Sequence, residues 1–88
     1  MEDQTIISCQ FSYYPLATTG VNEEVKEVLK IIVASDLQYE TGAMSTIVFG
    51  ESSKIFSLLE EIASKMNRQG FKYALSISIS NLCNCHLI

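Results

Sequence analysis

The sequence has few of the residues that many catalytic and nucleic-acid-binding sites require. It contains 88 residues, with one histidine, His86, one arginine, Arg68, and a formal net charge of −4. Non-specific binding to nucleic acid needs a basic surface that releases counterions from phosphates, so this balance argues against that class of protein. The acidic excess favours a cationic or neutral ligand only mildly.

Long apolar runs and a signal-peptide pattern are also absent. No apolar stretch approaches the roughly 20 residues that span a bilayer, and the first residues, Met1 to Gln4, are acidic and polar, unlike a signal peptide. The three cysteines are an odd number and do not form a disulfide framework. We therefore expect a soluble cytoplasmic protein whose cysteines stay reduced.

The composition is that of one small folded domain, covering residues 1–88. Hydrophobic residues make up 48% of the chain and charged residues 18%, which excludes disorder. A chain of this size hides only about 60–65% of its unfolded surface on folding. An oligomer would relieve that limit.

Hydrophobic periodicity divides the chain into six elements. Alternation over two residues predicts strands at 5–14, 37–41, 44–49 and 71–80. Helical spacing predicts a first helix capped by Asn22 and a second capped by Ser52 or Ser53, which ends before Gly70. Pro15 is expected to end the first strand, and residues 82–88 to form a loose tail.

The element order is β-α-β-β-α-β. Right-handed crossovers place both helices on one face of a four-stranded antiparallel sheet, which is the α+β ferredoxin-like fold. Thr41 to Ala43 should form the tight turn between the second and third strands.

Strand alternation also assigns the two faces of the sheet. The helices should cover the face that carries Ile7, Cys9, Phe11, Tyr13, Leu75, Ile77 and Ile79. The other face should carry Ser8, Gln10, Ser12, Tyr14, Ser76, Ser78 and Ser80, with Ser45, Ile47 and Phe49 if Thr46 points to the core. Small side chains let a second sheet approach closely, so this face is either a dimer interface or a solvated surface.

Two hydroxyl groups on the covered face stand out. Tyr13 and Thr46 occupy positions where aliphatic side chains would suffice, and buried hydroxyls need partners. Each either bonds a nearby backbone carbonyl or lines a pocket between sheet and helices. The walls of such a pocket would include Phe11, Tyr13, Tyr39, Met44 and Leu75.

Three segments resemble the signature segments of the YkoF-like thiamine-binding family. They are FSYYPL at 11–16, MSTIVFG at 44–50 and SISN at 78–81, in the family's order and spacing. The resemblance implies a ferredoxin-like fold, dimers or tetramers formed through the sheets, and non-catalytic binding of thiamine or its hydroxymethylpyrimidine moiety for uptake or salvage. Members with two tandem copies exist, whereas this chain carries one.

The same resemblance implies the ligand-contacting residues. Thr46 and Tyr13 match contacting positions of the family's third-strand and first-strand motifs, and Ser12, Ser45 and Ser80 lie nearby by the same mapping. An aminopyrimidine offers acceptors and an amino donor to hydroxyls, and its flat ring can stack on an aromatic side chain.

Other functions have weaker support in the sequence. An acylphosphatase of this fold needs an arginine after the first strand, and residues 15–20 contain none. Cys83, Cys85 and His86 offer thiolate and imidazole ligands for a metal ion. However, the C-x-C-H motif lacks the usual paired spacing and has no fourth ligand. We therefore expect neither an enzyme nor a cofactor. The alternative to thiamine binding is an oligomeric effector-binding or structural module with another ligand or none.

Overall fold

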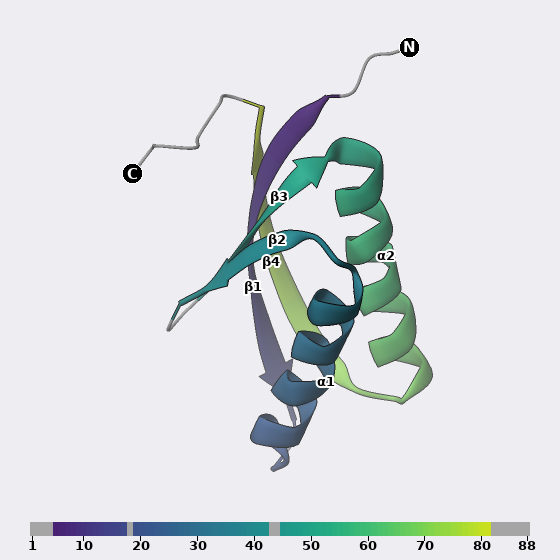
Figure 1. Ribbon diagram of the computed structural model, residues 1–88. Coiled ribbons are helices and arrows are strands. Elements are labelled where there is room, and N and C mark those ends of the chain that lie inside the picture. The colour runs from purple at the N-terminus through teal and green to yellow at the C-terminus, as the bar shows by residue number, and fades with distance from the viewer. Residues whose placement is uncertain (1–4, 18, 43–44, 82–88) are drawn as a thin grey trace.

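The computed structural model describes residues 5–17, 19–42 and 45–81. These residues form four strands and two helices, in the predicted order. The elements are β1 (Ile6–Leu16), α1 (Val21–Ala34), β2 (Gln38–Thr41), β3 (Thr46–Glu51), α2 (Ser52–Arg68) and β4 (Lys72–Ser80). Both helices lie on one face of the sheet (Figure 1). The ferredoxin-like α+β fold is thereby confirmed.

The strands of the antiparallel sheet lie in the order β2-β3-β1-β4. Cross-strand pairs such as Cys9 with Val48 and Cys9 with Ile79 fix the register. Because Phe11 pairs with Thr46, the threonine lies on the same face as the buried phenylalanine. Thr46 therefore points toward the helices, and Ile47 and Phe49 lie on the opposite face.

The core lies between the sheet and the two helices. Ile7, Cys9 and Phe11 of β1 are buried, while Gln10 between them is exposed, as the alternation predicts. The buried stripe of α2 consists of Ile55, Leu58, Ile62 and Met66, which recur at helical spacing. At about 25 cal/mol per Å² of buried apolar surface, such contacts dominate the stability of a small domain.

The prediction for the β4 face is partly wrong. Ile77 and Ile79 lie on the helix side but are 43% and 41% exposed. β4 is an edge strand, and α2 packs against β3 and β1, so this end of β4 has no helix over it. Val21 at the start of α1 is also 45% exposed, whereas Val28, Ile31 and Ile32 of the same helix are buried.

Element boundaries also differ from the prediction. Pro15 does not end β1, because this part of the strand pairs only with β4, where Pro15 faces Tyr73. A missing N–H is tolerated where one side of a strand has no neighbour. The predicted side-chain caps are wrong too: Gly20 precedes α1 and Glu51 precedes α2, and neither helix has a side-chain cap.

Two glycines occupy the positions expected of them at turns and element ends. Gly70 has φ +84° directly after the C-cap of α2, a left-handed position that favours glycine. Gly42 donates a backbone hydrogen bond of 2.7 Å to Ser45, which closes the described part of the β2–β3 hairpin. Residues 43 and 44 of the predicted turn and strand lie outside the described residues.

Candidate functional site

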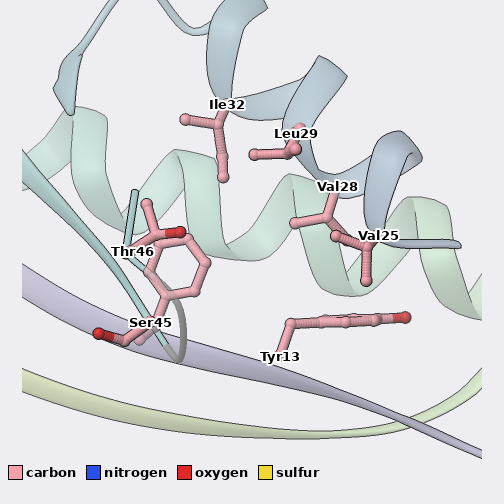
Figure 2. Close-up of a pocket in the computed structure, with 9 residues that line it drawn as sticks. Tyr13, Val25, Val28, Leu29, Ile32, Ser45 and Thr46 are labelled. Atoms are coloured by element: carbon pink, nitrogen blue, oxygen red, sulfur yellow. The ribbon is translucent and has the colours of Figure 1, made fainter. Parts of the chain in front are cut away.

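A cavity of about 170 Å³ lies between α1 and the sheet (Figure 2). Its apolar wall comes from one side of α1, and its floor comes from β1 and the start of β3. The lining residues are Phe11, Tyr13, Val25, Val28, Leu29, Ile32, Gly42, Ser45 and Thr46. Several of them are only half-buried, so the cavity opens to solvent.

Tyr13 contributes an aromatic surface that other residues hold in place. Its ring stacks on Tyr73, with ring centroids 5.1 Å apart and planes 24° apart. The hydroxyl of Tyr73 in turn donates to the carbonyl oxygen of Ala63 on α2, at 3.4 Å. The Tyr13 ring is therefore fixed in the offset arrangement that aromatic pairs prefer.

The hydroxyl group of Tyr13 donates a hydrogen bond to Oε2 of Glu24. The alternative of a bond to a backbone carbonyl is thus wrong for this residue. Burial raises the pKa of the Tyr13 phenol well above its ordinary value, and the bond to Glu24 and its charge raise it further. Tyr13 is consequently a neutral donor throughout the physiological pH range.

Thr46 and Ser45 stand at the hairpin end of the cavity. Figure 2 shows the Thr46 side chain rising from β3 toward α1, whereas the Ser45 oxygen points away from the other lining residues. That serine oxygen accepts a hydrogen bond of 3.3 Å from Nε2 of Gln10 on the open face of the sheet. Of the two hydroxyls, Thr46 is the better placed for a ligand in the cavity.

The structure brings three of the five predicted site residues to one cavity. Tyr13, Ser45 and Thr46 line it, whereas Ser12 and Ser80 do not. Ser12 pairs with Ser76 and Ser80 with Ser8, on the face opposite the helices. Among the predicted wall residues Phe11 lines the cavity, Tyr39 and Leu75 do not, and Met44 lies outside the described residues.

Sequence reasoning missed Glu24. An acidic residue in the first helical turn is usually a solvated complement to the helix dipole, but this side chain is 0% exposed. A signal was present, because Glu24 precedes Val28 by four residues and Ile31 by seven and therefore shares their face of α1. Because Glu24 is charged, it does not count as part of an apolar helical pattern.

No group of metal-ligating side chains occurs among residues 5–17, 19–42 and 45–81. The candidate ligands Cys83, Cys85 and His86 lie outside this part of the chain. Neither described helix has the length and apolar character needed to cross a membrane.

A ferredoxin-like domain whose small cavity has both aliphatic and hydroxyl-bearing lining residues is a suitable scaffold for binding a small molecule. The family pattern described as "Thiamine-binding protein" matches residues 9–81. The chain therefore belongs to the thiamine-binding protein family. No curated protein matches the sequence.

Solved structures share the fold of this chain. A candidate thiamine biosynthesis/salvage protein from Thermotoga maritima is 22% identical with a TM-score of 0.76, covering 85% of this chain and 82% of that one. A domain of unknown function from Bacillus cereus is 25% identical with a TM-score of 0.78, covering 88% and 76%. A hypothetical protein from Methanocaldococcus jannascii is 23% identical with a TM-score of 0.77, covering 91% and 84%.

Proposed function

We propose that this protein binds the hydroxymethylpyrimidine moiety of thiamine, free or as part of thiamine, without catalysing a reaction on it. The observation that carries the proposal is the cavity between α1 and the sheet, lined by aliphatic side chains, Tyr13 and Thr46. Membership of the thiamine-binding family supports the choice of ligand. Uptake or salvage of thiamine is the role we propose for this binding.

The size of the cavity favours one ring over two. An engineered cavity of about 150 Å³ holds benzene, and this cavity measures about 170 Å³. A substituted pyrimidine fits such a space, whereas sites for larger ligands run from about 300 Å³ upward. We therefore assign the pyrimidine to the cavity and leave the thiazolium ring of thiamine at its open side.

Isothermal titration calorimetry with hydroxymethylpyrimidine, thiamine and thiamine phosphates tests this proposal. Saturable heat is expected with the first two compounds. Thr46→Val removes a hydroxyl from the lining at nearly constant volume and should weaken binding about 5- to 10-fold, the value of one hydrogen bond. Tyr13→Ala removes the aromatic surface and should weaken binding more.

A matched control is available on the neighbouring strand. Thr41 pairs directly with Thr46 across the hairpin but is exposed and does not line the cavity. Thr41→Val should therefore leave the affinity unchanged. Absence of heat with all the compounds, from a folded wild-type protein, would refute the ligand assignment.

Self-association through the open face of the sheet is the second part of our proposal, and it would stand alone if no ligand bound. This face has no helix over it (Figure 1) and carries Ile47 and Phe49 among serines. Its strand positions at Ser76, Ser78 and Ser80 are exposed and small, which suits the approach of a second, identical face.

Light scattering tests this assembly. Phe49→Glu places a charge in the proposed interface and should convert the oligomer to monomers. The control is Phe56→Glu on α2, where the native side chain is already 53% exposed and far from the open face. If wild type and both variants have the mass of a monomer, this face is not an interface.

A further inference from the structure

The carboxylate of Glu24 is the one buried charged group in the described core, and one of its two oxygens has no hydrogen-bond partner. The side chain is 0% exposed. Oε2 accepts the hydrogen bond from Tyr13, whereas Oε1 has no hydrogen-bond partner in the described part of the chain. A buried oxygen left in this way costs its full desolvation penalty.

Nearby features of the protein do not supply the missing donor. The ion pairs observed among the described residues join Lys30 to Glu27 and Lys65 to Glu61, all at the surface. Glu24 lies in the first turn of α1, where the helix dipole favours a negative charge, but the dipole provides no N–H directed at Oε1. A buried oxygen without a donor calls for an explanation, and a donor supplied by a bound ligand would be one.

Glu24 does not itself line the cavity, but residues that contact it or share its helix face do. The ring of Tyr13 lines the cavity and its hydroxyl donates to the carboxyl group of Glu24. Val28, four residues after Glu24 on the same face of α1, is also a lining residue. The next residue along α1, Val25, lines the cavity as well. Figure 2 shows the Tyr13 hydroxyl pointing away from Thr46 and Ser45. Because that hydroxyl donates to Glu24, the carboxyl group lies beside the end of Tyr13 that is farther from the hairpin.

We infer that Glu24 determines ligand specificity by accepting a hydrogen bond through Oε1 from an amino group of the bound ring. The site would then select amino-substituted six-membered nitrogen heterocycles over rings of the same shape without the amino group. A carboxylate accepts at both oxygens and donates at neither, so it discriminates against a ring edge that carries only acceptors. This inference rests on the proposed function and adds the chemical feature that the cavity recognises.

The test compares two ligands and two protein variants. The ligands are 4-amino-5-hydroxymethyl-2-methylpyrimidine and the same ring without the 4-amino group. Wild type should bind the amino compound at least 10-fold more tightly, as expected for a hydrogen bond to a charged group. Glu24→Gln keeps the shape and an acceptor for Tyr13, and it should bring the two affinities to within about 3-fold of each other.

Tyr13→Phe separates direct recognition from mere positioning. It removes the hydroxyl group but leaves the carboxylate, so the preference for the amino compound should persist. If the preference falls equally in Tyr13→Phe and Glu24→Gln, Glu24 only orients Tyr13 and the inference is wrong. An unchanged preference in a folded Glu24→Gln protein also overturns it.

These outcomes can be told apart from failure of the proposed function. If wild type binds neither ring, the pyrimidine proposal and this inference fall together. If wild type binds both rings equally well, the cavity binds pyrimidines and only the role of Glu24 is overturned.

Discussion

The hydroxyl of Tyr13 on β1 donates a hydrogen bond to Oε2 of Glu24 in the first turn of α1. This bond joins the sheet to the helix that forms the apolar wall of the cavity. Removing the Tyr13 hydroxyl leaves a buried carboxylate with no hydrogen bond to either oxygen, since Oε1 is already without a partner. The pair should therefore contribute to stability as a unit.

A double-mutant cycle measures this unit. Tyr13→Phe should lower the free energy of unfolding by about 1–3 kcal/mol, because it strands the buried carboxylate. Glu24→Leu exchanges that carboxylate for an apolar side chain of similar size, so adding Tyr13→Phe to it should cost little. We expect the two changes to be non-additive by about 0.5–3 kcal/mol in urea denaturation.

Tyr14→Phe is the control for the loss of a phenolic hydroxyl. Tyr14 follows Tyr13 directly but lies on the open face and is 44% exposed. Its replacement should change stability by less than about 0.5 kcal/mol. Additive effects at Tyr13 and Glu24 would show that their hydrogen bond does not couple them.

The helix α2 offers a test of how its two sides differ. Ile62 is 0% exposed, so Ile62→Ala should leave a cavity and cost about 2–5 kcal/mol of unfolding free energy. Phe56 on the same helix is 53% exposed, so Phe56→Ala should cost less than about 0.5 kcal/mol. Similar losses in urea denaturation of the two variants would contradict the packing described for α2.

Much of this fold follows from periodicity alone. β1 alternates between buried and exposed side chains because one face of the sheet packs on helices, and the stripe of α2 recurs at helical spacing for the same reason. The exposure of Ile77 and Ile79 could not be predicted in this way, because periodicity assigns a side of the sheet but not how far the helices extend over its edge.

The site was predicted in part for a similar physical reason. Tyr13 and Thr46 were found as hydroxyls on a face that is otherwise apolar, and both line the cavity. Ser12 and Ser80 are candidates only because they lie near contacting positions in the sequence motifs. Adjacent positions in a strand point to opposite faces, and neither serine lines the cavity. The spacing of Glu24 to Val28 and Ile31 indicates its face of α1, but only the structure shows its pairing with Tyr13.

Gly50 should be intolerant of a side chain. Its φ of +154° is unusual for other residues, and a Cβ at this position would lie 2.7 Å from Cδ2 of Leu37. Gly50→Ala should cost about 1–3 kcal/mol of unfolding free energy. The clashing atom is at the tip of the Leu37 side chain. Adding Leu37→Ala should therefore remove the part of the loss that comes from the clash, whereas the part that comes from the backbone conformation of residue 50 should remain.

Gly42→Ala is the matched glycine control. A Cβ there would meet its nearest atom, the Ser45 carbonyl oxygen, at an ordinary 3.5 Å. Urea denaturation should show a smaller effect than at Gly50. Equal losses at the two glycines would mean that the conformation and crowding of Gly50 are not responsible.

Stability should decline in alkaline solution because two acidic groups are held neutral in the folded chain. Burial raises the pKa of the Cys9 thiol, and burial followed by the Glu24 bond raises that of the Tyr13 phenol. The unfolded chain releases these protons above about pH 8.5 and pH 10 respectively, whereas the folded chain retains them. Their stabilising contribution is complete below those values and is lost as pH rises toward the folded pKa.

Urea denaturation between pH 7.5 and pH 9.5 measures the contribution of Cys9 to this pH dependence of stability. The background should carry Cys83→Ser and Cys85→Ser, so that no disulfide forms at high pH. In this background stability should fall by up to about 1.4 kcal/mol per pH unit above pH 8.5. Cys9→Ala should start less stable, through lost packing, but decline less over the same interval. Parallel declines with and without the Cys9 thiol would assign the pH dependence to other groups.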